Sequence, residues 1–220
     1  MARKKVDIRR VYRILEEEYP KWHVPVADLV EAQTRDPFKV LVATLLSAQT
    51  RDAVTSKVSE KLFSRVDDLK DLEEVSEDEL RELIRPVSYY NTKAKHLKRL
   101  APMLREEFGG EVPETVEELV RLPGVGRKTA NVTLASAFRK PAIGVDVHVF
   151  RITNRLGYVR TKTRHETEMR LRQKLPKELW VNFNTYLVAL GQRICTPISP
   201  KCSECPLYDE CNRVGVTRSR

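Results

Sequence analysis

The sequence predicts an all-α protein, and three features of its pattern indicate this class. Apolar residues recur at helical spacing along most of the chain, and no run of period-two alternation with hairpin turns competes with them. Proline and glycine interrupt the pattern where the helical segments end. With 220 residues, the chain is long enough to bury a substantial core, in one domain or in two small ones.

Three helices are predicted in the first part of the chain. A helix is expected from about Asp7 to Tyr19, because apolar side chains recur on one face of it. Another opens at Asp36-Pro37, an N-cap followed by a first-turn proline, and its nearly continuous apolar run predicts that it is buried. Ser76 and Glu79 resemble a capping box, which starts a short helix before Pro86.

The remaining predicted helices flank the strongest interruption of the pattern. A helix from Lys93 to Phe108 ends at a pair of glycines, and Pro113 restarts the helical pattern. The segment Leu122–Gly126 then forms a glycine-bearing turn between two helices. Beyond it, four helices are expected before a cysteine-bearing tail, near Arg127–Phe138, His148–Leu156, Glu166–Leu175 and Glu178–Ile194.

The charge balance favours a polyanionic partner. Forty Lys and Arg residues against 31 Asp and Glu give a formal net charge of +9, which bears on association rather than on fold and leaves the partner open. The N-terminal segment lacks the apolar region of a secretory signal, and no stretch approaches the ~20 apolar residues that span a bilayer. We therefore expect a cytoplasmic, soluble protein without membrane contact. A monomer is the default expectation.

The glycine-bearing turn has the properties of a phosphate-binding hairpin. Gly124 and Gly126 stand where the backbone must bend sharply or approach a ligand. The free N–H groups and the positive end of the next helix suit a phosphate. An ordinary corner between two helices uses the same glycines, so spacing alone leaves both interpretations open.

Lys128 lies in the first turn of the helix that follows this hairpin. The helix dipole and the neighbouring Arg127 both disfavour its ammonium form, which predicts a lowered pKa and a better nucleophile. Schiff-base chemistry requires such an amine. A solvated or phosphate-contacting charge is the alternative role for Lys128.

All four cysteines lie close together near the C-terminus, at Cys195, Cys202, Cys205 and Cys211. Four thiolates complete either a tetrahedral zinc site or a 4Fe-4S cluster, and spacing alone hardly separates the two. The single C-x2-C pair lacks the second knuckle of a zinc ribbon. A pair of disulfides is a third interpretation, disfavoured in a reducing compartment.

Taken together, these motifs resemble those of the endonuclease III family. The similar segments occur in the family's order and cover most of the chain: Leu45–Gln49 with Asp52, Tyr90–Ala94, Leu122–Asn131, Val145–Arg151 and the cysteine run. The resemblance implies two α-helical domains flanking a DNA-binding cleft. Residues 30–140 would form a six-helix barrel domain with a helix-hairpin-helix motif. Residues 1–29 and 141–220 would form a discontinuous domain whose four cysteines hold a 4Fe-4S cluster.

The resemblance also implies a mechanism. The protein would be a bifunctional base excision repair enzyme on chromosomal, double-stranded DNA containing damaged pyrimidines or abasic sites. Lys128 would attack C1′ of a flipped nucleotide, and β-elimination from the resulting Schiff base would cleave the strand. Asp146, across the cleft, would stabilise charge developing on the sugar and help Lys128 lose its proton. The alternative role of Asp146 is to cap the helix that follows it.

Further residues of the family's motifs are implied to contact DNA. Gln49 and Tyr89 occupy positions that insert into the gap left by the flipped base, with a solvated helix end and a packed aromatic as the respective alternatives. The other expected DNA contacts come from the hairpin: Leu122, Gly124, Val125, Gly126, Arg127 and Thr129. Ser47, Asp52 and His148 are candidates for the substrate pocket.

One residue departs from the motif, and two other functions compete with the main hypothesis. Ser88 stands where the family usually has glycine, which bears on the conformation of its loop. A non-catalytic DNA-binding protein would need neither Lys128 nor Asp146. A monofunctional mismatch or adenine glycosylase would release a base without cleaving the strand, and Lys128 weighs against it.

Overall fold

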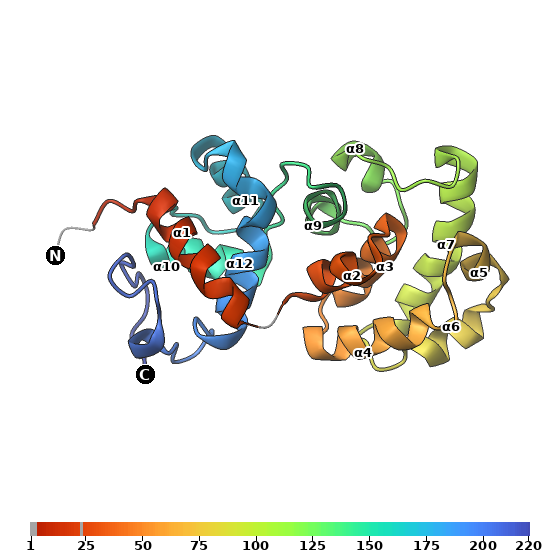
Figure 1. Cartoon of the computed structure of the whole chain (residues 1–220), viewed down its shortest axis with the longest axis horizontal. Coiled ribbons are helices and arrows are strands. Elements are labelled where there is room, and N and C mark those ends of the chain that lie inside the picture. Colours follow the sequence, from red (N-terminus) through yellow and green to blue (C-terminus); the bar gives the residue numbers. More distant parts are fainter. Residues whose placement is uncertain (1–3, 23) are drawn as a thin grey trace. The chain divides into compact units, whose positions relative to one another are not determined.

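The computed structural model describes residues 4–22 and 24–220, so the start of the basic N-terminal segment, residues 1–3, lies outside it. The described residues form α-helices and short 3-10 helices, with no β-strand among them, which confirms the all-α prediction (Figure 1). They divide into two compact units. We call Val26–Lys140 the central unit, and the described residues up to Pro25 together with Pro141–Arg220 the terminal unit. None of the helices described is long and apolar enough to cross a bilayer.

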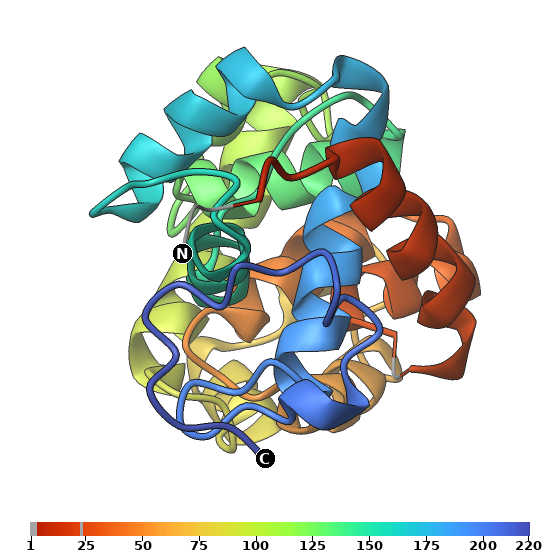
Figure 2. The same cartoon turned by 90° about the vertical axis from the view of Figure 1, so that its left-hand side faces the viewer.

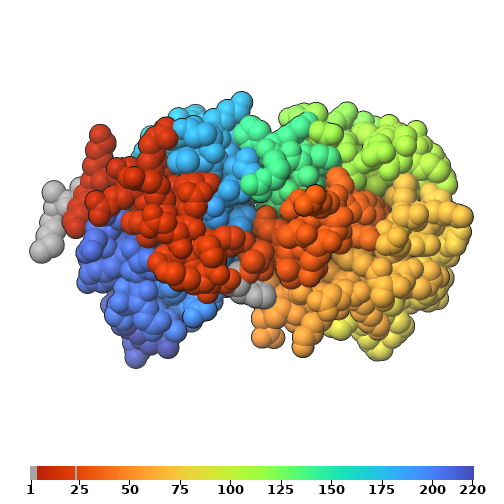
Figure 3. Space-filling view, viewed as in Figure 1, coloured from red at the N-terminus to blue at the C-terminus, as the bar shows by residue number. Residues whose placement is uncertain are grey.

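The terminal unit is assembled from both ends of the chain. Its helices are α1 (Ile8–Glu18), α10 (Val147–Leu156), α11 (Arg164–Lys174) and α12 (Trp180–Arg193), with 3-10 helices at Tyr19–Lys21, Lys177–Leu179 and Cys202–Glu204. Figure 2 shows α1 beside α12, whose Phe183 is completely buried against the apolar face that carries Leu15. The first described residues lie beside the loop that carries Asn212, in the blue C-terminal part of the chain, on the surface of this unit (Figure 3).

The predicted starts of two helices are confirmed by their caps. The side chain of Asp7 accepts hydrogen bonds from the backbone N–H groups of Arg9 and Arg10, at 3.1 and 3.2 Å, and starts α1. Asp36 accepts from Phe38 N at 2.8 Å, and Pro37 takes the first helical position of α3 (Pro37–Ser47).

The central unit contains α3 and seven other helices. These are α2 (Val26–Thr34), α4 (Asp52–Phe63), α5 (Leu69–Glu74), α6 (Glu77–Ile84), α7 (Tyr90–Phe108), α8 (Val116–Leu119) and α9 (Arg127–Phe138). Six of the eight have at least eight residues. Residues 40–46 of α3 are all buried, as its apolar run predicts, because α2, α4, α7 and α9 pack around it.

Several helices differ from those predicted. Three lie outside the prediction, α2, α4 and α5, because the last has only six residues and the others carry few apolar residues in a regular pattern. The helix α7 begins at Tyr90 rather than Lys93, after a residue in the left-handed conformation. The helix α11 begins at Arg164, where the Thr163 hydroxyl accepts from Glu166 N at 3.1 Å. A 3-10 turn precedes α12, which therefore starts at Trp180.

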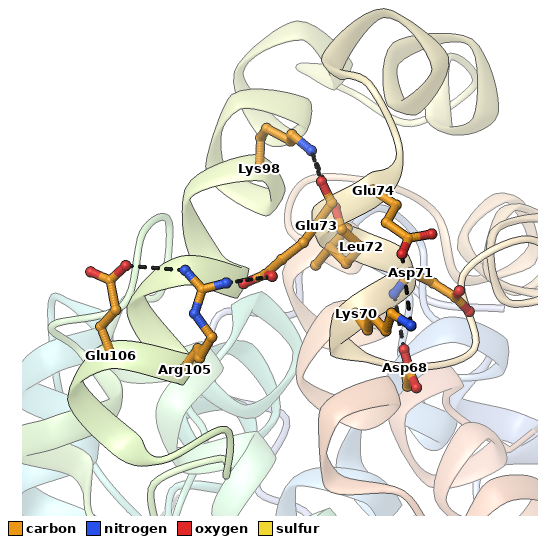
Figure 4. Close-up of polar contacts among 9 residues, drawn as sticks. All are labelled: Asp68, Lys70, Asp71, Leu72, Glu73, Glu74, Lys98, Arg105 and Glu106. Atoms are coloured by element: carbon orange, nitrogen blue, oxygen red, sulfur yellow. Dashed lines mark hydrogen bonds and ion pairs between the residues drawn. The ribbon is translucent and has the colours of Figure 1, made fainter.

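A lysine of α7 closes the end of α5. Nζ of Lys98 donates to the carbonyls of Glu73 and Val75, both at 2.5 Å, and to that of Leu72 at 3.5 Å. Arg105, two turns further along α7, pairs with the Glu73 carboxylate at 2.6 Å (Figure 4). The ammonium satisfies carbonyls that the end of a helix leaves without partners, so it ties α5 to α7.

Candidate functional site

The hairpin between α8 and α9 is built around Gly124. Its φ is +77°, and a Cβ at this position would stand 2.4 Å from Nδ1 of His96 in α7. Only glycine satisfies both conditions. Leu122 and Val125 are buried at 2% and 6% exposure, and Val125 N donates to Leu122 O at 3.1 Å. Their side chains therefore fix the turn to the core, and the backbone at the tip remains on the surface.

The N-terminus of α9 presents backbone donors that its N-cap residue does not cap. Gly126 is the N-cap residue and supplies no side-chain hydrogen bond. A Cβ at Gly126 would have nothing within 4 Å, so the space beside this helix end is open. Arg127 is exposed, whereas Thr129 is 5% exposed. An anion approaching this end would meet backbone N–H groups and the positive helix dipole.

Lys128 lies in the first turn of α9 and is half-buried. Its charge is close enough to act on Lys93 of α7: burial, and then the charge of Lys128, lower the pKa of Lys93 to about 8.

Asp146 caps α10 in the terminal unit. Its Oδ1 accepts from the backbone N–H groups of His148 at 2.8 Å and Val149 at 2.9 Å. The capping role considered for this residue is therefore present in the structure. Both bonds use Oδ1, so Oδ2 takes no part in the cap. The carboxylate is held in one orientation while remaining half-buried.

Arg151 connects α10 to the cysteine loop and was missed by the sequence analysis. Its guanidinium donates twice to the Cys195 carbonyl, at 2.7 and 3.0 Å, and once to Gly191 O at 3.1 Å. It also lies 3.0 Å from Nδ1 of His148. Burial lowers the pKa of Arg151, while the neighbouring Cys195 raises it. The candidate pocket residue His148 is thus part of a contact network with α12.

The side chains of Gln49 and Tyr89 are both exposed, and the backbone of both residues has the left-handed conformation. Each has a φ of +58°, in a region that residues other than glycine rarely occupy. The interpretation of Tyr89 as a packed aromatic is wrong, because 65% of its surface is exposed. Ser88 does not have a positive φ, so its backbone does not require the glycine usual at this position. Its N–H donates to Oγ1 of Thr50 at 3.1 Å.

Lys93 lies beneath these two residues and was also missed by the sequence analysis. It is 6% exposed, and its Nζ donates to the carbonyls of Leu46 and Ala48, both at 2.7 Å, and to Thr50 Oγ1 at 3.3 Å. Helical spacing places Lys93 four residues before the buried Leu97, on the buried face of α7. A lysine at such a position is a signal that sequence reasoning could have used.

The two other pocket candidates make contacts within the central unit. Ser47 Oγ, at the end of α3, donates to Thr44 O at 2.8 Å. Asp52, the first residue of α4, accepts from Val26 N at 3.4 Å. Both side chains are half-buried. Both residues therefore have structural partners that account for their positions.

The four cysteines line one pocket, together with Arg155, Tyr208 and Arg213 among other residues. All four are free thiols, so they form no disulfide with one another. Arg155 donates to Cys195 Sγ at 3.3 Å, and Arg213 N donates to Cys211 Sγ at 3.4 Å. Burial raises the pKa of Cys205 to about 12. Thiols that surround a cavity and receive hydrogen bonds on sulfur fit a 4Fe-4S cluster, in which such bonds tune the metal centre.

Among the described residues, the four cysteines included, no three His, Cys, Asp or Glu side chains are grouped so that they could hold a single metal ion. The loop is instead fixed from outside by Asn212, whose Nδ2 donates to Leu156 O at 2.8 Å and to Lys4 O at 3.0 Å. In return, Lys4 N donates to Asn212 Oδ1 at 2.8 Å. The four thiols are thus held in place by bonds to α10 and to the start of the described chain.

Comparisons with known proteins agree with this geometry. Residues 42–177 match the family model of the HhH-GPD superfamily of base excision DNA repair proteins, and residues 195–211 match the iron–sulfur binding domain of endonuclease III. An endonuclease III of Thermotoga maritima is 43% identical over 80% of this chain and 83% of its own length. One of Bacillus subtilis is 44% identical over 84% of each.

A solved structure leads to the same family. It is a trapped covalent intermediate of an endonuclease III with DNA, which has a TM-score of 0.83 at 39% identity and covers 94% of both chains. The hairpin, the cysteine loop and these likenesses agree over nearly the whole chain. The chain therefore belongs to the endonuclease III family, as a DNA-binding base excision repair glycosylase with a 4Fe-4S cluster.

Proposed function

We propose that this glycosylase is bifunctional: it removes oxidised pyrimidines from duplex DNA and then cleaves the strand at the abasic site through a Schiff base on Lys128. The observation that carries the proposal is the position of Lys128, a half-buried amine in the first turn of a helix whose N-terminus has no side-chain cap. The trapped covalent complex of the related endonuclease III with DNA supports a nucleophile of this kind.

The chemistry follows from an amine attacking the sugar. The target nucleotide must leave the base stack, because C1′ is shielded in a stacked duplex. Nζ of Lys128 forms a bond to C1′ as the bond from C1′ to the base breaks, and the base leaves with a proton. Loss of a proton from nitrogen and opening of the sugar ring give the imine. The imine withdraws electrons, so the C2′ proton is lost and the 3′ phosphate is expelled by β-elimination.

Asp146 has an electrostatic part in this reaction. Its carboxylate stabilises positive charge that develops on the sugar, and it favours loss of a proton from the attacking ammonium. The cap on α10 fixes Oδ1, which orients the group in advance. One carboxylate thus serves as both helix cap and charge partner.

DNA contacts are proposed for the hairpin and for two exposed loops. The backbone at Gly124 and Gly126, with the exposed Arg127, binds phosphate. Leu122, Val125 and Thr129 support the turn from within, because their side chains are buried. Gln49 and Tyr89 fill the gap left by the flipped base. The protein acts as a monomer on damaged chromosomal DNA.

The cofactor is proposed to be held by Cys195, Cys202, Cys205 and Cys211 as its four thiolate ligands. When bound, the 4Fe-4S cluster cross-links the loop, and it is not the site of base excision. Arg155 and Arg213 N donate to the ligand sulfurs and so help to place them.

Borohydride trapping on a duplex with thymine glycol tests the proposal, by comparing the natural protein with Lys128→Ala. A covalent protein–DNA adduct that depends on Lys128 is expected. Lys95→Ala, which removes an exposed lysine of α7, is the matched control and should leave the adduct unchanged. Base release without adduct or nick would point to a monofunctional glycosylase and overturn the lyase step. DNA binding without base release would overturn both steps.

A further inference from the structure

We propose that Lys93 is a positioning residue that holds Gln49 and Tyr89 in one fixed arrangement, with Thr50 as the link between them. The inference rests on the proposed function, in which these two side chains fill the gap beside a flipped nucleotide. It gives a role to a set of hydrogen bonds made by Lys93 and Thr50, to which neither the motifs nor the fold gives one. We call these bonds the clasp.

The first half of the clasp encloses Gln49. Nζ of Lys93 donates to Ala48 O at 2.7 Å and to Thr50 Oγ1 at 3.3 Å, so its bonds fall on both sides of Gln49. A third bond, to Leu46 O at 2.7 Å, attaches the same ammonium to the last turn of α3. An ammonium has three donors, and these three acceptors use all of them.

The second half encloses Tyr89. On one side, Ser88 N donates to Thr50 Oγ1 at 3.1 Å. On the other, the backbone N–H of Lys93 itself donates to Tyr89 O at 3.0 Å. The Thr50 hydroxyl accepts from both Lys93 and Ser88 and lies 3.5 Å from Ala48 O as a donor, so its hydrogen-bonding capacity is used. The Thr50 side chain therefore joins the two loops.

The backbone at both residues needs such support. Gln49 and Tyr89 each have a φ of +58°, which side-chain-bearing residues hold only when surrounding contacts enforce it. Their own side chains are exposed and do not supply those contacts. Burying a charged group is costly, yet Lys93 is 6% exposed, and burial lowers its pKa to about 8. The polar contacts that hold this charge lie at the end of α3 and on both sides of Gln49, and one of them, Thr50, also accepts from Ser88 N beside Tyr89.

A second lysine of α7 provides a matched control. Lys98 makes the same kind of clasp, with three bonds to the carbonyls of Leu72, Glu73 and Val75 at the end of α5. None of those acceptors belongs to the Gln49 or Tyr89 loop. Lys93→Met and Lys98→Met therefore remove equivalent bonds from one helix, and only the first affects the gap-filling residues.

The test compares both variants, with the cluster bound, on two substrates. We expect Lys93→Met to slow single-turnover release of thymine glycol by on the order of 10- to 100-fold, the scale of a misplaced positioning group. The rate at which Lys93→Met cleaves a preformed abasic site should fall several-fold less than its rate of thymine glycol release, because no base must be extruded from an abasic site. A 2-aminopurine placed opposite a tetrahydrofuran abasic analogue should brighten less on saturation with Lys93→Met than with the natural protein. Lys98→Met should match the natural protein in all three measurements.

Thr50→Val keeps the ammonium and its two carbonyl bonds but removes the acceptor of Ser88 N. It should show the same pattern as Lys93→Met with a smaller loss, and it carries the test if Lys93→Met does not fold. The positioning role is overturned if the soluble variant slows both substrates equally, or slows neither. Failure of the proposed function would give a different result, because the natural protein would then form no Lys128-dependent adduct. The 2-aminopurine signals of the natural protein and Lys93→Met could still be compared in that case, so the positioning role would be tested independently.

Discussion

Gly191 of α12 lies against the ring of His148, where a Cβ would stand 2.3 Å from Nδ1. Side-chain atoms do not pack at that distance, so the absence of a side chain at 191 allows the ring to approach the helix. The ring is in turn 3.0 Å from Nη2 of Arg151, which also donates to the Gly191 carbonyl. One glycine therefore permits the contacts that join α10, α12 and the cysteine loop.

Gly191→Ala is expected to displace the His148 ring and weaken the bonds that Arg151 makes. Overpacking of this kind costs about 1–3 kcal/mol of unfolding free energy. Urea denaturation of the cluster-loaded protein measures it. Arg193→Ala, at an exposed position of the same helix, is the control and should change stability by less than about 0.5 kcal/mol. Equal stability of the two variants would show that the ring moves aside without cost.

The two roles of Asp146 separate in a pair of substitutions. Asparagine caps helices about as well as aspartate, so Asp146→Asn should keep its stability within a few tenths of a kcal/mol. It removes the charge, so we expect single-turnover base excision to fall at least ~100-fold. Asp146→Ala should lose the activity and also about 0.5–2 kcal/mol of stability. If Asp146→Asn kept full activity, Asp146 would have no electrostatic role in catalysis and would serve only as a helix cap.

The two glycines of the hairpin should respond differently to alanine. At Gly124 the φ of +77° and the 2.4 Å approach to His96 predict a stability loss of about 1–3 kcal/mol. At Gly126 a Cβ meets nothing within 4 Å, so Gly126→Ala should be less destabilising. It should nevertheless weaken DNA binding, because the added Cβ occupies the space proposed for a phosphate. Chemical denaturation and fluorescence anisotropy with a short duplex measure the two effects. Unchanged DNA affinity in Gly126→Ala would place the phosphate elsewhere.

Lys93 should make the stability of the protein depend on pH in alkaline solution. Its pKa is about 8 in the folded chain, against the 10.5 that is usual for a solvated lysine, so between these values the unfolded chain binds more proton. The contribution of this group to the free energy of unfolding is therefore constant below about pH 8 and rises with pH up to about 10.5. The natural protein should gain up to roughly 3 kcal/mol relative to Lys93→Met across this window. Denaturation of both proteins at several pH values measures the difference, and parallel profiles would contradict it.

Local chemistry made part of the fold predictable. The Asp36 cap acts within two residues, so the start of α3 could be derived from the sequence, and the apolar face of α1 placed its start near Asp7. The continuous apolar run of α3 likewise indicated burial. The short α5 could not be found in this way, because only Leu72 of its six residues is buried.

In the functional site, too, only the features made by residues close together in the sequence were predictable. The hairpin glycines and the cysteine run are local patterns, and the resemblance located them. The contacts that Lys93 and Arg151 make with distant segments were not predictable, because those acceptors lie 40 to 47 residues away in the sequence. The left-handed backbone at Tyr89, after which α7 starts three residues early, lies beside another distant bond, from Ser88 N to Thr50, 38 residues away in the sequence. Pattern reasoning is limited to neighbours along the chain, and these bonds are made between segments that only the fold brings together.

The assembly of the terminal unit from two stretches has a consequence for the order of events during synthesis. The apolar face of α1 packs on α12, which leaves the ribosome after every residue of the central unit. The Asn212 bonds to Lys4 close later still. The central unit is continuous and can fold as soon as it is made, whereas α1 must wait for its partner. The cysteine loop follows α12, so a nascent chain acquires its metal cluster only after the whole central unit and α12 have been made.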